Sequence, residues 1–162
     1  VSVEAIEEEY NYIRYHGNWH DFSKNIDVIS KLDHKITFNM LHFILNYKSI
    51  HTCVDYLKGK GFKDNSFVIG PLYNPPHLNT MNLPDEMMHE VLFVLKDRLE
   101  RHPTGYLKNS YENLVEYYTS TNFKKNMKSF YYNLGSMDQR RKQDARNVFP
   151  ELFKGLDAYT LE

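Results

Sequence analysis

Cysteine is almost absent from this chain, which has only Cys53 among its 162 residues. A single cysteine cannot build a disulfide framework, and it cannot supply the ligands of an iron–sulfur or zinc site by itself. Chains without disulfides are typical of reducing compartments, so we expect a cytoplasmic protein. Cys53 lies on the apolar side of an expected helix, where a buried and unreactive thiol is the favoured interpretation.

Long apolar runs are also missing. The longest uncharged apolar stretch, residues 36–46, includes Thr37, Asn39 and His42 and is too short to cross a bilayer. The first nine residues hold four glutamates, which is unlike the basic and then apolar pattern of a signal peptide. We therefore expect no membrane partner.

An excess of charge of either sign is absent as well. Lys and Arg total 20 and Asp and Glu total 21, which leaves a formal net charge of −1. This balance argues against a tail that binds polyelectrolytes. Hydrophobic residues make up 41% of the chain, which is enough for a folded core.

The first half of the chain alternates short apolar strands with amphipathic helices. We expect strands near residues 1–4, 36–44 and 66–73, helices over 18–33 and 49–59 with Ser49 as a cap, and a connection over 5–18. This order is typical of parallel βαβ units, in which all strands end at one edge of the sheet. Ligands bind at that edge.

From Pro84 onward no strand pattern remains. We expect a long helix up to His102-Pro103, two helices over residues 107–118 and 123–134, a shorter one opened by Ser136 and a last one near Phe149. The chain thus divides into 1–83, with the strands, and 84–162, which is helical. Three strands and two crossover helices leave a sheet poorly covered. The chain also opens with Val rather than Met, so we expect half of a larger α/β barrel or sheet.

Several residue pairs with metal-like or phosphate-like spacing are better explained without a ligand. His16 and His20 flank a helix start, and Glu86 with His89 lacks the second pair that a di-iron site needs. Gly59-x-Gly61 does not follow a strand and lacks the third glycine of a phosphate loop.

Three polar residues near the first strand are more informative. Ser2 and Glu4 are two residues apart and would point to the same side of a strand, where they could bind a ribose diol or an amine. Arg14 could bind a carboxylate through two hydrogen bonds. A surface ion pair between Glu4 and Arg14 is an equally good interpretation.

Residues 120–146 carry seven basic and two acidic side chains, an excess of 7 − 2 = +5. Tyr131 and Tyr132 lie among them, so a nucleic-acid face is one interpretation. A solvated helix surface is the favoured one, because no recognised binding motif accompanies the charge.

The block from Ser2 to Ala5, followed by Tyr10 to Trp19, resembles a segment of radical S-adenosylmethionine proteins with a twitch domain. In those proteins the segment reads Ser-Ile-Asp-Gly and then Tyr-Glu-Tyr-Ile-Arg-Tyr-Pro-Gly-x-Trp. Three later stretches agree in order and spacing: Leu45-Asn46, Leu72 to Pro84 and Met137 to Leu152. The similarity covers nearly the whole chain, and the Tyr-Ile-Arg-Tyr-x-Gly-x-Trp block is its most specific part.

The resemblance implies the second half of a partial (β/α)6 barrel followed by helices. It implies S-adenosylmethionine as cofactor and a 4Fe–4S cluster whose Cys-x3-Cys-x2-Cys ligands lie upstream of Val1, in the remainder of a parent polypeptide. The parent enzyme would cleave S-adenosylmethionine reductively to a 5′-deoxyadenosyl radical and act on an unknown substrate, such as a peptide or a small molecule. This chain alone would be inactive.

The resemblance also assigns cofactor-binding positions: Ser2 and Glu4 face the ribose, Arg14 faces the methionyl carboxylate, Asn46 follows the fifth barrel strand, and Tyr73 and Asn74 lie near the adenine. No catalytic residue and no metal ligand is expected in this chain. The alternative is a non-enzymatic α/β and helical interaction module, which would bind nucleic acid through residues 120–146.

Overall fold

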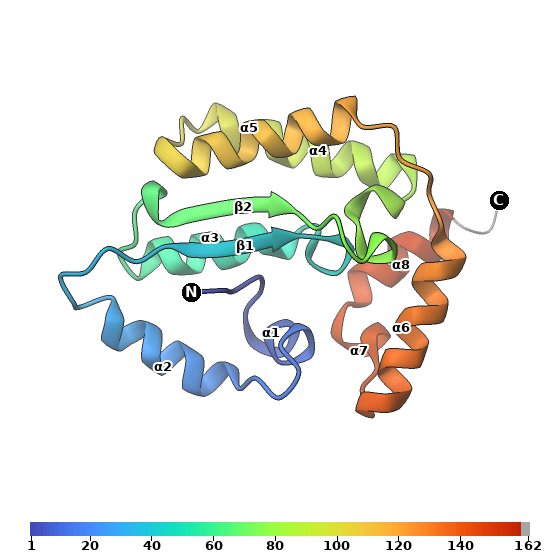
Figure 1. Ribbon diagram of the computed structural model, residues 1–162, viewed down its shortest axis with the longest axis horizontal. Helices are drawn as coiled ribbons and strands as arrows, with labels where there is room; N and C mark the ends of the chain where they lie inside the picture. The colour runs from blue at the N-terminus through green and yellow to red at the C-terminus, as the bar shows by residue number, and fades with distance from the viewer. Residues whose placement is uncertain (160–162) are drawn as a thin grey trace.

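The computed structural model describes residues 1–159 and contains a small parallel sheet surrounded by helices (Figure 1). Its two strands are β1 (Phe38–His42) and β2 (Phe67–Pro71), which pair in register from Phe38 opposite Phe67 to His42 opposite Pro71. The parallel α/β arrangement predicted from the sequence is confirmed at this level. Apolar residues at every second position explain the pairing, because they place one face of each strand in the core.

The N-terminal segment extends this sheet on the other edge of β1. Ser2 forms a parallel bridge with Asn39, the Asn39 amide donates to the Val1 carbonyl at 2.8 Å, and the Val3 amide donates to the Asn39 carbonyl at 3.4 Å. The expected first strand is therefore present as a single bridge. The three segments run parallel and end at the same edge.

Three helices connect these segments. They are α1 (Glu7–Ile13), α2 (Trp19–Ile29) and α3 (Ser49–Gly59), with a 3-10 turn at Ile44–Asn46 before α3 and another at Asp64–Ser66 after it. The connection expected over 5–18 contains a helix that the sequence analysis did not predict, α1. Three glutamates in its first turn favour a helix start, and its two tyrosines are buried. Lys48 is the N-cap of α3, so Ser49 does not cap it.

The second half of the chain is helical, as predicted. Two 3-10 turns (Pro76–Leu78 and Thr80–Asn82) lead into α4 (Asp85–Glu100), α5 (Gly105–Ser120), α6 (Met127–Arg141), α7 (Ala145–Val148) and α8 (Pro150–Tyr159). The prediction of a separate helix from Ser136 is wrong, because α6 continues to Arg141. Within residues 1–159, none of the helices has both the length and the apolar character needed to cross a bilayer.

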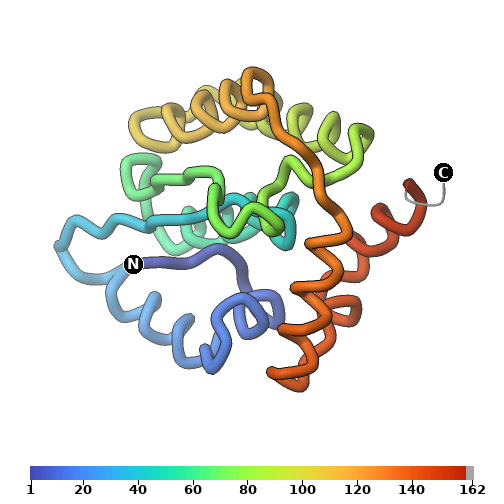
Figure 2. The backbone as a smooth tube through the Cα atoms, turned by 45° about the vertical axis from the view of Figure 1, so that its right-hand side comes forward, coloured from blue at the N-terminus to red at the C-terminus, as the bar shows by residue number. Residues whose placement is uncertain are grey.

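One face of the sheet packs against the core, and the other is more exposed to solvent. Phe38, Met40 and Ile69 point into the core, whereas Leu41 and Val68 are 43% and 40% exposed on the opposite face. Figure 1 shows α3 behind the strands, and the turned view in Figure 2 places no helix over their front. One face of the sheet is thus open over its apolar side chains.

The core continues across the expected boundary at residue 84. The Ile69 amide donates to Ser110 Oγ at 2.9 Å, so α5 covers the edge of β2. His42 at the end of β1 bonds to the Tyr118 hydroxyl at 2.7 Å. The change from strands to helices at this point therefore does not separate two cores. Cys53 lies in the shared core and is fully buried, as predicted.

Candidate functional site

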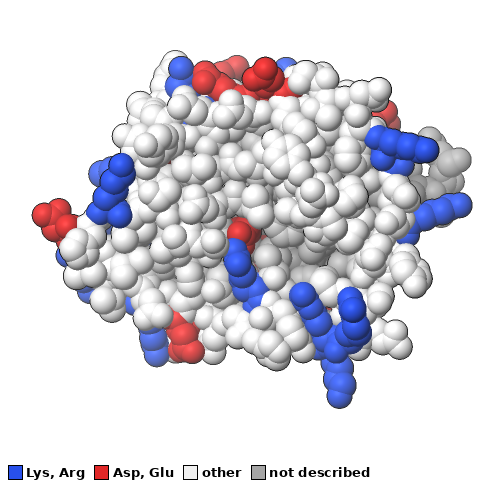
Figure 3. Space-filling model, viewed as in Figure 1, with Lys and Arg blue, Asp and Glu red and all other residues white. Residues whose placement is uncertain are grey.

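A hollow of about 240 Å³ lies at the edge where the parallel segments end. Its walls come from the N-terminal segment, α1, the ends of β1 and β2, and α6. Eleven residues line it: Glu4, Tyr12, Ile13, Arg14, Leu41, Phe43, Leu45, Leu72, Leu78, Met137 and Arg141. Figure 3 shows that the face viewed in Figure 1 is largely uncharged, with one small acidic spot next to basic side chains near its centre. A ligand here would meet apolar walls and few charges.

The charged centre of the hollow is the pair formed by Glu4 and Arg14. Arg14 Nε donates to Glu4 Oε2 at 2.9 Å, and Arg14 NH2 donates to Glu4 Oε1 at 2.5 Å. Of the two sequence interpretations, the ion pair is the one present, but it is not a surface pair. Glu4 is only 4% exposed, whereas the Arg14 side chain is 39% exposed.

Burial and pairing act on Glu4 in opposite directions. Burial raises the pKa of the Glu4 carboxyl, while the hydrogen bonds and the positive charge of Arg14 lower it. A guanidinium has five N–H groups, and Glu4 accepts from two of those on Arg14. The exposed part of Arg14 can therefore still donate to an anion in the hollow.

A tight turn after α1 brings Arg14 to the strand end. Arg14 is the C-cap of α1, its amide donates to the Tyr10 carbonyl, and the Gly17 amide donates to the Arg14 carbonyl at 2.5 Å. A Cβ at position 17 would lie 2.6 Å from that carbonyl oxygen, so the turn needs glycine. The Tyr-Ile-Arg-Tyr-x-Gly block thus has a local structural role, which is to hold Arg14 beside Glu4.

Arg141, at the end of α6, is a second guanidinium at the hollow. It donates to the Tyr12 carbonyl at 3.3 Å and lies 4.7 Å from the centre of the Tyr15 ring. Sequence reasoning missed this residue as part of the site: it counted Arg141 in the basic segment and in the C-terminal stretch that resembles the family, without a binding role. Arg141 lies 127 residues after Arg14, so no local sequence pattern could show that the two side chains meet at one hollow.

Asn46 lies behind the pair and binds only backbone. Its side-chain amide donates to the carbonyls of Glu4 at 3.0 Å and Leu41 at 2.8 Å, and its oxygen accepts from the Phe43 amide at 2.8 Å. Asn46 is fully buried, and its side chain joins the N-terminal segment to the end of β1 through these hydrogen bonds.

The other expected cofactor-binding residues lie outside the lining of the hollow. Ser2 is exposed on the N-terminal segment, and Asn74 is exposed beyond β2. Tyr73 is 60% exposed and packs edge-on against Tyr117 with ring centres 5.2 Å apart. The structure therefore joins Glu4, Arg14 and Asn46 by hydrogen bonds, whereas Ser2, Tyr73 and Asn74 do not line the hollow.

The described residues do not fit an iron–sulfur cluster. Burial raises the pKa of the Cys53 thiol, and Cys53 is the one cysteine of the chain. Within residues 1–159, no three His, Cys, Asp or Glu side chains converge in a way that could hold a metal ion.

The basic side chains of residues 120–146 are partly paired. Lys125 contacts Asp85, and Arg146 donates to Asp157 at 2.8 Å. Both acidic partners lie outside the segment, so the local excess of charge is smaller than the sequence count. Lys124, Lys128 and Lys142 are exposed along α6 and next to its ends.

No family model, no curated protein and no solved structure shows a significant match to this chain.

Proposed function

We propose that this chain forms the second half of the barrel of a radical S-adenosylmethionine enzyme and that its hollow contacts that cofactor. The observation that carries the proposal is the buried Glu4–Arg14 pair beside an apolar hollow where parallel strand segments end. In parallel α/β folds this edge is where ligands bind. The open, apolar face of the sheet is consistent with the inner wall of a barrel.

The residues of the hollow fit parts of the cofactor. The free N–H groups of Arg14 suit the methionyl carboxylate, and Glu4 has lone pairs left to accept from a ribose hydroxyl. Leu41, Leu72 and Met137 would cover apolar parts of the molecule. A volume of about 240 Å³ is below the usual range of small-molecule pockets, so the hollow would hold one portion of the cofactor.

In this role the chain supplies positioning. When bound at a reduced cluster, S-adenosylmethionine supplies the radical chemistry of the family. This chain would orient the cofactor and exclude water from one side of it, which lowers the barrier by proximity. The cluster ligands would come from other parts of a parent polypeptide, and this chain would form one wall of the substrate cavity.

The test is cofactor binding by the polypeptide that joins this chain to a cluster-binding half. Arg14→Leu should weaken S-adenosylmethionine binding about tenfold or more in calorimetry, because it removes charged hydrogen bonds to the carboxylate. Arg101→Leu is the control, since Arg101 pairs only with Asp97 on the surface of α4. Equal affinities for the wild type and the Arg14 variant would contradict the proposal.

A non-enzymatic nucleic-acid module is the second candidate. It is favoured by the exposed Lys124, Lys128 and Lys142 together with Tyr132, which is 78% exposed on α6. Binding of a single-stranded oligonucleotide at several salt concentrations tests it. A slope of log K against log salt that becomes shallower by about 0.7 to 1 with each Lys→Gln change would support the module.

A further inference from the structure

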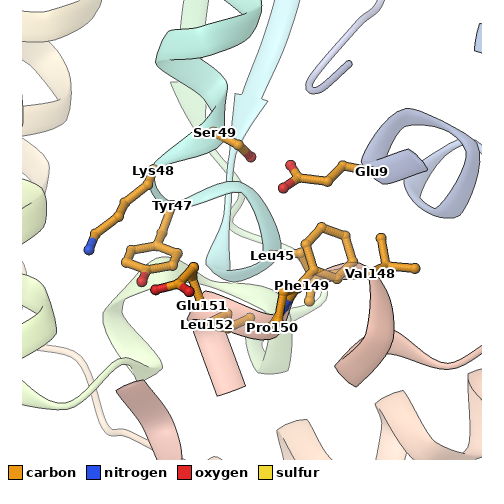
Figure 4. Close-up of a pocket in the computed structure, with 10 residues that line it drawn as sticks. All are labelled: Glu9, Leu45, Tyr47, Lys48, Ser49, Val148, Phe149, Pro150, Glu151 and Leu152. Atoms are coloured by element: carbon orange, nitrogen blue, oxygen red, sulfur yellow. The ribbon is translucent and has the colours of Figure 1, made fainter. Parts of the chain in front are cut away.

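A second hollow, of about 290 Å³, shares only Leu45 with the lining of the hollow that holds the Glu4–Arg14 pair. It is enclosed by α1, the start of α3 and the segment that joins α7 to α8 (Figure 4). Its lining residues are Glu9, Leu45, Tyr47, Lys48, Ser49, Val148, Phe149, Pro150, Glu151 and Leu152. Neither the proposed function nor the sequence patterns use it.

Two polar atoms in this hollow are buried and have no hydrogen-bond partner within residues 1–159. They are Oε2 of Glu9 and Oγ of Ser49. Figure 4 shows the Glu9 carboxyl and the Ser49 hydroxyl pointing toward one another across the hollow. Burial raises the pKa of the Glu9 carboxyl, and the facing hydroxyl of Ser49 partly opposes this. A buried polar oxygen that forms no close hydrogen bond is costly, and the facing hydroxyl only partly offsets this for Glu9, so the pair is suited to a ligand that donates hydrogen bonds to both oxygens.

The charges at the rim also favour a cation. Lys48 is the one basic residue of the lining, and it is held by Glu90 at 2.6 Å and lies 5.3 Å from the Tyr47 ring centre. Glu9 and Glu151 are the two acidic residues of the lining. Although α3 and α8 both begin here, an anion at these helix starts would be repelled by the two carboxylates.

The rest of the wall is apolar. Leu45, Val148, Phe149, Pro150 and Leu152 form it, and Figure 4 shows them below and beside the polar pair. We propose that this hollow binds a primary alkylammonium group, with the nitrogen between Glu9 and Ser49 and an apolar stem against Val148 and Phe149. A free small amine and a lysine side chain of a peptide both carry this chemistry. The proposal does not depend on the proposed function.

The test uses the full chain in phosphate buffer and n-butylamine as the probe, followed by amide chemical shifts in NMR. We expect saturable amide shifts confined to Glu9 and to the residues of 47–49 and 148–152 other than Pro150, and none with n-butanol, which has the same stem without the charge. Glu9→Gln should weaken n-butylamine binding about tenfold or more, because the neutral amide loses the ion pair. Glu8→Gln, an exposed neighbour on α1, should leave it unchanged.

The two sources of the ammonium group are then separated with a blocked Gly-Lys-Gly peptide and its Gly-Gly-Gly counterpart. Shifts at the same residues with the lysine peptide would assign the hollow to protein ligands, and shifts with n-butylamine alone would assign it to small amines. Absence of shifts with both, or equal affinity in Glu9→Gln with an unchanged melting temperature, would overturn the proposal. Ser49→Ala, which removes the hydroxyl but keeps the carboxylate, should weaken binding by a smaller factor than Glu9→Gln.

Discussion

Arg14 holds the buried carboxylate of Glu4 through two hydrogen bonds of 2.9 and 2.5 Å, and so joins the end of α1 to the N-terminal strand segment. One partner is almost fully buried and the other is half-exposed. This asymmetry decides how the two residues respond to mutation, because the buried partner depends on the exposed one.

Removal of Arg14 should destabilise the fold. Loss of one partner of a fully buried ion pair costs about 3–5 kcal/mol, and water can replace part of Arg14, so we expect about 2 kcal/mol for Arg14→Leu. Urea unfolding measures this. The double variant Arg14→Leu with Glu4→Gln should recover part of the loss, because no buried charge is left. A double variant less stable than Arg14→Leu alone would contradict this account.

Replacement of Asn46 should be costly for a different reason. In Asn46→Asp a carboxylate oxygen takes the place of the amide that donates to the carbonyls of Glu4 and Leu41, so both carbonyls lose their donor. A buried polar group without a hydrogen bond costs about 1–3 kcal/mol. With two carbonyls affected, we expect a loss of about 3 kcal/mol or more in urea unfolding. Asn109→Asp, at an exposed position of α5, should change stability by less than about 0.5 kcal/mol.

Acid should unfold the protein through its buried histidines. Burial lowers the pKa of His42 from 6.5 to about 4 and that of His51 to about 3. Between pH 6.5 and pH 4 these histidines are protonated in the unfolded chain but remain largely neutral in the fold. The free energy of unfolding therefore falls as the pH falls. His42 alone accounts for about 3 kcal/mol over this window.

The comparison with His42→Gln isolates this effect. Glutamine does not titrate, so the variant should lose less stability between pH 6.5 and pH 4.5 than the wild type in urea unfolding. The raised pKa values of Glu4 and Glu9 act in the opposite direction and are common to both proteins. Parallel pH profiles would show that His42 takes up its proton in the folded state.

Tyr12→Phe should weaken the attachment of α1 to α6. The Tyr12 hydroxyl donates to Asp138 Oδ1 at 2.5 Å, while Asp138 Oδ2 accepts from the Ala145 amide. A hydrogen bond to a charged group contributes about 1.5–3 kcal/mol, and we expect a loss at the lower end because Asp138 keeps its second donor. Tyr132→Phe, on an exposed ring, should be neutral in the same thermal and urea measurements.

Periodicity predicted the elements whose packing is local. The helix faces of α2 and α3 and the alternation of β1 were readable because their apolar residues recur at 3.6 or 2 residues. The helix α1 was missed because its buried tyrosines, Tyr10 and Tyr12, are two residues apart, and their ring partners lie in other helices or after them: Trp19 in α2 for Tyr10 and the distant Phe149 for Tyr12. These contacts carry no signal in the local sequence.

The break predicted near Ser136 failed for a related reason. Ser136 looked like a helix start, but it lies inside α6, and the nearby Asp138 binds the Tyr12 hydroxyl and the Ala145 amide. At the site, spacing suggested that Glu4 and Arg14 could meet, and it left open whether they would bind each other. Arg141 reaches the hollow only through the tertiary fold. Cofactor binding remains a prediction for all six of the residues named for it: Ser2, Glu4, Arg14, Asn46, Tyr73 and Asn74.

The hydrogen bond between Tyr12 and Asp138 can form only late in synthesis, after α6 has left the ribosome. The two residues are 126 positions apart, so at about 5–20 residues per second Tyr12 leaves the ribosome at least several seconds before its partner exists. Until α6 emerges, α1 lacks the acceptor that secures it and the Arg141 that completes the hollow next to Arg14. A nascent chain arrested before α6 should therefore expose the segment around Tyr12 to protease, and release of the finished chain should close it.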